Sequence, residues 1–272
     1  MDCAAKTALW VAARRALESE RDGRLFEDPF ARALAGEDGF EVLVTGESLI
    51  GSAGVPIIEV RTAHYDRRMA ELTSAGLRQV VVLAAGMDAR AYRIKWPGGV
   101  RFFEIDRAEV LERKRTRLVR AVPRCDRRSI AADLREDWPA ALRAGAFDDR
   151  EPTLWLVEGL LYYLEEAAVR ELLARVSAMS RPGSALLCEL AGRSLLESPA
   201  MKPALEAMAK LGAPWISGTD DPAELFTPLG WDVALTDPGD VGRSLGRWPL
   251  PPPPPGAPPG PRFHFVEATK RA

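Results

Sequence analysis

The chain has 272 residues, a mass of 29.8 kDa and 47% hydrophobic residues, which suits one α/β domain with a few additions. A formal net charge of −2 and a sequence pI of about 5.9 give no global basic field, which argues against nucleic acid or anionic lipid as partners. Three scattered cysteines and two histidines, with no C-x-x-C pair, argue against a zinc cage or a disulfide framework, so we predict no bound metal.

Residues 1–76 are predicted to be mainly helical. From Thr7 to Glu20 the apolar residues recur at helical spacing, and the pair Asp28-Pro29 predicts the start of a second helix. Residues 39–58 are Gly-rich and ambiguous, whereas residues 61–76 predict a third helix. The N-terminus lacks the apolar core of a signal peptide, and no window reaches the length of a membrane span. We therefore expect a cytoplasmic protein without a membrane partner.

Short apolar runs follow, separated by segments that are mostly predicted as helices. This alternation indicates βαβ units and a parallel sheet covered on both faces. The last two runs have no predicted helix between them, which indicates an antiparallel terminal hairpin. The fold class is thus α/β, with a Rossmann-like, seven-stranded, mostly parallel sheet. The seven runs are residues 79–85, 100–106, 127–134, 152–159, 184–190, 231–237 and 262–271.

The segment WPLPPPPPGAPPGP, residues 248–261, separates the last two predicted strands. Proline has no backbone N–H and cannot pair in a sheet, so we expect a stiff extended connection that bulges outward. Such a segment is either a docking motif for a partner with an aromatic groove or a tolerated surface insertion, and we favour the insertion.

The residues at the carboxyl ends of the first four strands indicate the ligand, because open parallel sheets bind ligands outside these ends. They are Ala84, Ala85, Gly86, Glu104, Asp106, Asp133 and Glu158. Gly86 permits close backbone approach, and an acid about twenty residues later suits a ribose hydroxyl pair. The other glycines of a dinucleotide fingerprint are absent, and Asp88 would repel a phosphate. This pattern predicts a nucleoside ligand without phosphates.

S-adenosylmethionine fits this description, since its adenosine carries a positively charged sulfonium and an amino-acid tail. Asp133 and Leu134 are suited to bind adenine, and Glu158 could receive the cationic tail. The alternatives are structural. Asp106 could instead cap the next helix with Glu109, which would leave Glu104 as the ribose acceptor. Asp133 could be an ordinary turn residue.

Several segments resemble the leucine carboxyl methyltransferase family, a branch of the class I S-adenosylmethionine-dependent methyltransferases that includes O-methyltransferases of secondary metabolism. The resemblance covers roughly residues 7–190 and, more weakly, the terminal hairpin. The segments that carry it are DPFARALAG, RTAHYD, AAGMDARAYRI, FFEIDRAEVLERK, ADLREDWPAAL and PTLWLVEGLLYYL.

The resemblance implies a role for each cofactor-site residue. Arg61 would bind the cofactor carboxylate, Glu158 its amino-acid end, and the turn from Ala84 to Gly86 its methionine portion. Asp106 would bind the ribose, and Asp133 and Leu134 the adenine. S-adenosylhomocysteine would be the product. The family commonly has glycine at Ala84 and threonine at Ala89 of this chain, and the extra methyl group of Ala84 is expected to lie near the ligand. Taken alone, Arg61 could also be an ordinary surface cation.

Catalysis is expected to rest on alignment of the acceptor with the methyl group and on exclusion of water. An ionised carboxylate acceptor needs no general base, whereas a phenol benefits from one. His64 is the one imidazole expected near the site, and Tyr162 is either a substrate contact or a core residue. The scarcity of bases favours a carboxylate of a small molecule or peptide.

The expected organisation is therefore a single methyltransferase domain. Residues 1–76 form a helical cap, residues 77–190 bind the cofactor, residues 191–230 with Trp215 and Phe226 form a substrate lid, and residues 231–272 form the hairpin with its proline-rich insertion. Two other functions stay open: a phenol or hydroxyl O-methyltransferase, and a catalytically silent S-adenosylmethionine-binding module. An NAD-dependent oxidoreductase is disfavoured by the missing glycines of the first turn.

Overall fold

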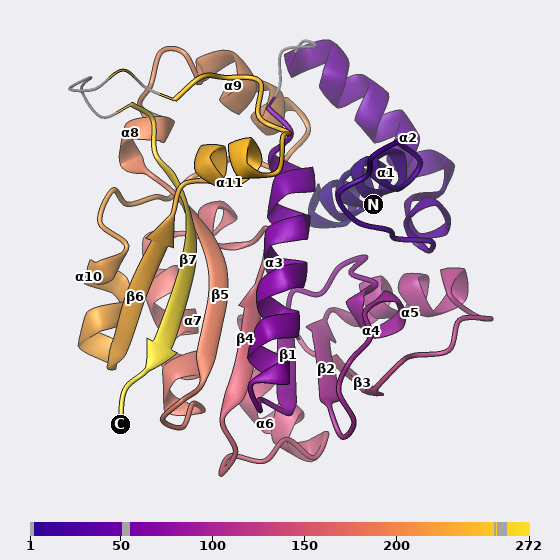
Figure 1. The fold of residues 1–272 in the computed structure, drawn as a ribbon, viewed down its shortest axis with the longest axis vertical. Helices are drawn as coiled ribbons and strands as arrows, with labels where there is room; N and C mark the ends of the chain where they lie inside the picture. The colour runs from indigo at the N-terminus through magenta and orange to yellow at the C-terminus, as the bar shows by residue number, and fades with distance from the viewer. Residues whose placement is uncertain (1–2, 51–54, 253, 255–259) are drawn as a thin grey trace.

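A seven-stranded sheet with helices on both faces forms the centre of the computed structural model, which describes residues 3–50, 55–252, 254 and 260–272 (Figure 1). The strand order is β3-β2-β1-β4-β5-β7-β6, and the first five of these strands are parallel. β7 is antiparallel to both β5 and β6. The strands are β1 Gln79–Leu83, β2 Arg101–Asp106, β3 Asp126–Ala131, β4 Thr153–Val157, β5 Ala185–Ala191, β6 Trp231–Thr236 and β7 Phe263–Lys270. The predicted fold class is thereby confirmed.

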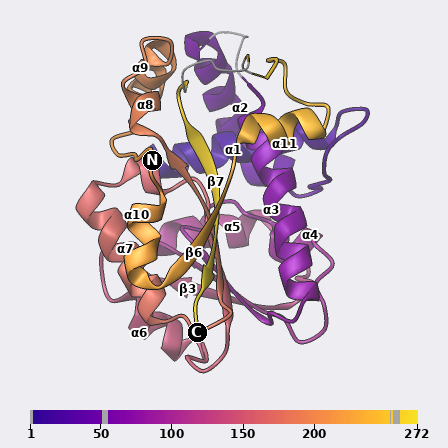
Figure 2. The ribbon, with the colours of Figure 1, turned by 60° about the vertical axis from the view of Figure 1, so that its left-hand side comes forward.

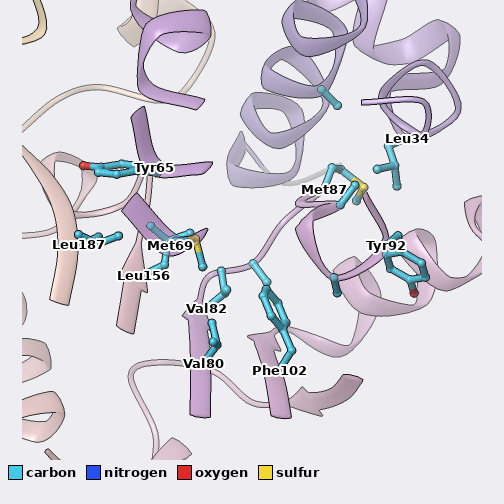
Figure 3. Packing of buried hydrophobic residues seen from close by; sticks show 14 of the residues in the cluster. Leu34, Tyr65, Met69, Val80, Val82, Met87, Tyr92, Phe102, Leu156 and Leu187 are labelled. Carbon is cyan, nitrogen blue, oxygen red and sulfur yellow. The ribbon is translucent and has the colours of Figure 1, made fainter. Parts of the chain in front are cut away.

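The central strands are buried on both faces, as expected for a parallel sheet. Val80 and Val82 of β1 point into one hydrophobic cluster, whereas Val81 and Leu83 point into another, because successive strand side chains alternate. Figure 3 shows the first cluster, in which Val80, Val82 and Phe102 pack near Met69.

The two clusters lie on opposite faces of the sheet, so the molecule has three layers: helices, sheet and helices. Helices α1, α3 and α5 contribute to the first cluster, and α6, α7 and α10 to the second. Figures 1 and 2 both show α1 and α2 beyond the carboxyl ends of the parallel strands. The helices on the N-terminal side of β4 are α1 Cys3–Ser19, α2 Ala31–Ile50, α3 Ile57–Ser74, α4 Arg90–Arg93, α5 Ala108–Arg117 and α6 Trp138–Ala144. Those after β4 are the 3₁₀ helix η1 Leu161–Tyr163, α7 Glu166–Ala178, α8 Arg193–Leu196, α9 Lys202–Lys210, α10 Ala223–Phe226, the 3₁₀ helix η2 Thr227–Leu229 and α11 Pro238–Ser244.

One prediction about the elements was wrong: a helix, α11, lies between the last two strands. Asp237 begins it by accepting hydrogen bonds from the N–H groups of Gly239 (2.7 Å) and Asp240 (3.1 Å), and Pro238 occupies the first turn. The ambiguous stretch after residue 39 belongs to α2 as far as Ile50, and this helix is kinked at Gly36. Six residues of the proline-rich segment, 253 and 255–259, lie outside the described residues.

Ala84 is held in a left-handed backbone conformation, with φ +52°. This conformation costs a non-glycine residue about 1–2 kcal/mol. We expect Ala84→Gly to raise the free energy of unfolding by up to about 1 kcal/mol, because glycine relieves the strain but makes the unfolded chain more flexible. Urea unfolding monitored by circular dichroism measures this change.

Two alanines serve as controls for this substitution. Ala146 has φ +66° in an exposed turn, so Ala146→Gly should give a similar gain. Ala174 is exposed within helix α7, where glycine should lower the free energy of unfolding by about 1 kcal/mol. A loss of stability in Ala84→Gly as large as that in Ala174→Gly would show that the turn is unstrained.

Candidate active site

The turn after β1 lies where the strand order reverses between β1 and β4, the position at which open α/β sheets bind ligands. Ala84 and Gly86 both have positive φ, and both are half-buried. A Cβ atom on Gly86 would lie 3.2 Å from the Cβ of Ala8, so α1 packs directly over the turn. The structure therefore gives this turn the tight, close-approach backbone that the sequence predicted.

Asp106 connects the end of β2 to this turn. Its carboxylate accepts hydrogen bonds from the N–H of Gly86 (2.7 Å) and the N–H of Arg107 (2.8 Å). Burial raises its pKa, and the two N–H groups partly offset this effect. Asp106 does not act as the helix cap considered as an alternative, because the cap position of α5 is Arg107. Each carboxylate oxygen keeps a second lone pair that could accept from a ligand hydroxyl.

Glu104, the other candidate for a ribose, is committed elsewhere. Its side chain is wholly buried, 3.0 Å from Lys114 Nζ and 2.6 Å from Arg127 Nη2. It lies within β2 rather than at the strand end, paired with Ser129 of β3 in the sheet register. Of the two acids of β2, Asp106 is therefore the one that lies at the carboxyl edge of the sheet.

Asp133 and Leu134 lie in the turn after β3. Asp133 accepts hydrogen bonds from the backbone N–H of Arg135 (2.9 Å) and from its guanidinium (2.6 Å). These bonds lower the pKa of Asp133 to about 2. Leu134 is half-buried against the second hydrophobic cluster. Asp133 is thus an ionised turn residue, as its structural alternative predicted, and this geometry leaves a role toward adenine open.

Arg61 is buried rather than on the surface. Its Nε lies 2.8 Å from Glu158 Oε1, and its Nη1 lies 2.9 Å from Glu189 Oε1. Burial disfavours the charged guanidinium, but the two carboxylates outweigh it and hold the pKa of Arg61 well above its usual range. The structure therefore brings Arg61 and Glu158 together, as expected of two residues in one site.

These residues belong to a longer chain of buried charges, which we call the buried ion-pair chain. Arg90 joins Glu158 (2.7 Å) to Asp66 (2.7 Å) and also pairs with Asp88. Asp66 pairs with Arg93, and Arg93 lies 3.6 Å from Asp28. The chain consists of Arg15, Asp28, Arg93, Asp66, Arg90, Asp88, Glu158, Arg61 and Glu189.

The buried ion-pair chain carries more negative than positive groups, with five carboxyl groups against four guanidinium groups. Burial alone would raise the pKa of Asp88 and Glu158, but Arg90 and its neighbours outweigh it and lower both. A surplus of carboxylate at a sheet edge favours a cationic ligand over a phosphate.

Sequence reasoning missed Glu189 and most of the arginines in this chain. Glu189 is 1% exposed within the otherwise apolar strand β5. An acid inside such a strand needs a buried partner, and this signal could have singled it out. The partner itself could not be read from the sequence, because Arg61 and Glu189 are 128 positions apart.

His64 and Tyr162 lie in different surroundings. The ring of His64 stacks on Phe265 of β7, with centroids 5.0 Å apart. Burial, together with Arg67 and Arg68, lowers the pKa of His64 to about 4. By contrast, the hydroxyl of Tyr162 is within 3.3 Å of Arg61 Nη1 and 3.5 Å of Glu189 Oε1. Tyr162 therefore belongs to the candidate site, and the placement of His64 does not support the predicted role of a base.

The two aromatic residues expected in the lid, Trp215 and Phe226, also lie in different places. Trp215 is half-buried and its ring centroid lies 4.3 Å from that of Tyr162. Phe226 is wholly buried in the second cluster with Trp231, under the terminal strands. Only Trp215 of this pair therefore lies beside the candidate site.

Two surface hollows are lined by residues outside the candidate site. One hollow of about 480 Å³ lies between residues 76–78 and 151–152, and another of about 930 Å³ lies along α2. No group of histidine, cysteine or acidic side chains suited to a metal occurs in the part of the chain that the structure describes. Among the helices of those same residues, none is long and apolar enough to cross a membrane.

Removal of Arg90 should strongly destabilise the protein, because three largely buried carboxylates contact its guanidinium. An uncompensated buried charge costs about 3–5 kcal/mol, so we expect Arg90→Leu to lower the free energy of unfolding by that amount. The matched control is Arg170→Leu, which removes an exposed pair with Glu166 and should change it by less than about 1 kcal/mol. Equal effects in urea unfolding would contradict the importance of the buried ion-pair chain.

Solved structures share this fold at low sequence identity. A DUF574 family protein from Streptomyces avermitilis superposes with a TM-score of 0.64 at 14% identity, covering 92% of this chain and 97% of that one. An O-methyltransferase family protein from Burkholderia thailandensis gives a TM-score of 0.50 at 13% identity, covering 98% of this chain and 70% of that one. These similarities concern the fold.

Sequence comparisons are more specific. A relative from Streptomyces coelicolor is 41% identical over 250 residues, covering 89% of this chain and 87% of its own. Another, from Streptomyces avermitilis, is 41% identical over 239 residues, covering 84% and 82%. Both are named "Putative S-adenosyl-L-methionine-dependent methyltransferase". The family model for leucine carboxyl methyltransferase matches residues 8–177. The chain therefore belongs to the leucine carboxyl methyltransferase family and is an S-adenosylmethionine-dependent methyltransferase.

Proposed function

We propose that this methyltransferase transfers the methyl group to oxygen, and that the acceptor is a carboxylate of a small molecule or peptide. The observation that carries this proposal is the environment of the imidazole: His64 faces β7, and its pKa is lowered to about 4. An acceptor that is already ionised near neutral pH needs no base from the enzyme. The family description, which names a leucine carboxyl group, supports the same acceptor class.

The candidate site fits the cofactor in its chemistry. Asp106 would bind the ribose hydroxyls with its remaining lone pairs, and the turn from Ala84 to Gly86 would lie against the methionine portion. Arg61 would bind the cofactor carboxylate, Glu158 its ammonium group, and Asp133 with Leu134 the adenine. The carboxylates of the buried ion-pair chain suit the ammonium and sulfonium groups of the cofactor. When bound, S-adenosylmethionine supplies an electrophilic methyl group on its sulfonium.

The residues around this position would contribute alignment and exclusion of water. Helix α1 packs over the turn through Ala8, and Arg15 of the same helix donates a hydrogen bond to the carbonyl of Met87. Tyr162 and Trp215 form an aromatic wall beside Arg61. Burial raises the pKa of Tyr162 well above its usual range, so its hydroxyl stays neutral and acts as a hydrogen-bond donor. We propose that Tyr162 orients the acceptor rather than accepting its proton.

Radiolabelled methyl transfer distinguishes the acceptor classes. The purified protein would be incubated with S-adenosylmethionine labelled on the methyl group and with matched acceptors: a panel of carboxylic acids, the corresponding primary amides, and phenols of similar size. We expect label to enter the acids and not the amides. Brief treatment with alkali should then release the label as methanol, because methyl esters hydrolyse under conditions in which aryl methyl ethers do not.

Each other outcome supports a different function. Alkali-stable label in the phenols would replace the carboxylate proposal with phenol O-methylation. Binding of S-adenosylhomocysteine without transfer to any acceptor would favour the silent binding module. Tyr162→Phe is the companion variant: loss of its hydroxyl should reduce kcat/KM for the acid by about tenfold, since one neutral hydrogen bond is worth about 0.5–1.5 kcal/mol.

A further inference from the structure

Glu189 is a buried acid to which the proposed reaction assigns no role. It lies on the face of β5 that packs against α3, where its carboxylate is completely buried. Its Oε1 accepts from Arg61 Nη1 (2.9 Å) and from the N–H of Gly159, and its Oε2 accepts from the hydroxyl of Tyr65 (3.3 Å). These contacts hold together α3, the end of β4 and β5.

Arg61 is shared between two acids. Its Nε donates a hydrogen bond to Glu158 and its Nη1 donates one to Glu189. These two carboxylates already balance the positive charge of Arg61 before a ligand carboxylate binds. A third carboxylate beside this guanidinium would place three negative groups around one cation. Either one acid must move away or one must take up a proton. Glu158 also pairs with Arg90, whereas Arg61 is the only cation for which the described residues show an ion pair with Glu189.

We propose that Glu189 is a positioning residue that orients Arg61 toward the cofactor carboxylate and takes up one proton from solvent when that carboxylate binds. This inference rests on the proposed role of Arg61 in cofactor binding. The protonated acid would keep accepting the N–H of Gly159 through its carbonyl oxygen and could donate its own proton to a neighbouring oxygen. Arg61 is then free to neutralise the ligand.

The charges that face Glu189 support this choice of proton acceptor. Arg61 and Tyr65 face it from α3, Glu158 from the end of β4 and Tyr162 from η1, and Cys188 neighbours it on β5. Phe265, its partner in the register of β7, is apolar. Burial raises the pKa of Glu189 to about 7, against the opposing effect of Arg61. The group is thus poised to gain a proton near neutral pH, whereas the pKa of Glu158 is lowered.

The affinity for the cofactor is expected to depend on pH. The form that binds the cofactor has a protonated Glu189, so affinity is highest at low pH and falls as the pH rises through about 7. Between pH 6 and pH 8 we expect the Kd of S-adenosylhomocysteine to rise about tenfold, and binding at pH 7 to take up about half a proton.

Isothermal titration calorimetry of the full chain with S-adenosylhomocysteine, in buffers of different ionisation enthalpy, measures this uptake directly. Glu189→Gln should bind without proton uptake and with a Kd that changes less than about twofold over the same range. The matched control is Glu267→Gln, which removes a carboxylate of β7 that pairs with Arg68 of the same helix α3. This control should keep the uptake of the wild type.

The outcomes separate this inference from the proposed function. Failure of the wild-type protein to bind S-adenosylhomocysteine at any pH would overturn the cofactor site and this role together. Tight binding without proton uptake, or uptake that persists in Glu189→Gln, would overturn the role of Glu189 alone. If Glu189→Gln does not fold, infrared difference spectroscopy of the wild-type protein decides the matter: ligand binding should produce a new band of a protonated carboxyl group, and its absence would contradict the inference.

Discussion

The buried ion-pair chain is the constraint on which the candidate site depends. A charge taken out of water is tolerated only when it is paired, so each arginine of the chain fixes the positions of its acids. Arg15 comes from α1, Arg61 from α3 and Arg90 from α4, and their acids come from loops, helices and strands on every side. The sheet supplies an apolar scaffold, and the ion pairs decide how the helices meet at its carboxyl edge.

This arrangement joins the stability of the fold to its chemistry. The reversal of strand order beside β1 opens the edge, and the strained turn from Ala84 to Gly86 brings the backbone close to it. Asp106 ties that turn to the next strand, whereas Glu104 of the same strand ties the sheet to α5 through Lys114. Two acids of one strand thus have different partners, because Glu104 lies within β2 beside Lys114, whereas Asp106 ends the strand beside the turn.

The sequence was informative wherever a local pattern decides the structure. Alternating apolar runs predicted the parallel sheet, and acids after the strands predicted most of the residues that now stand at its edge. It was less informative where distant residues meet: nothing local shows that Arg61 contacts Glu189, or that His64 stacks on Phe265. Helix α11 was missed although Asp237-Pro238 repeats the Asp-Pro signal read at residues 28 and 29, because the proline run beyond it suggested an irregular connection.

The most direct test of the account is a calorimetric titration with S-adenosylhomocysteine of the wild-type protein, Asp106→Asn and Glu109→Gln. Asp106 lies at the sheet edge with free lone pairs, and Glu109 is an exposed acid three residues later. Both substitutions replace a carboxylate with an amide, so the two variants differ mainly in the position of that change. We expect Asp106→Asn to weaken binding by about tenfold or more, because hydrogen bonds to a charged group are worth about 1.5–3 kcal/mol, and Glu109→Gln to leave it nearly unchanged. Equal affinity in all three folded proteins would contradict a cofactor site at this edge.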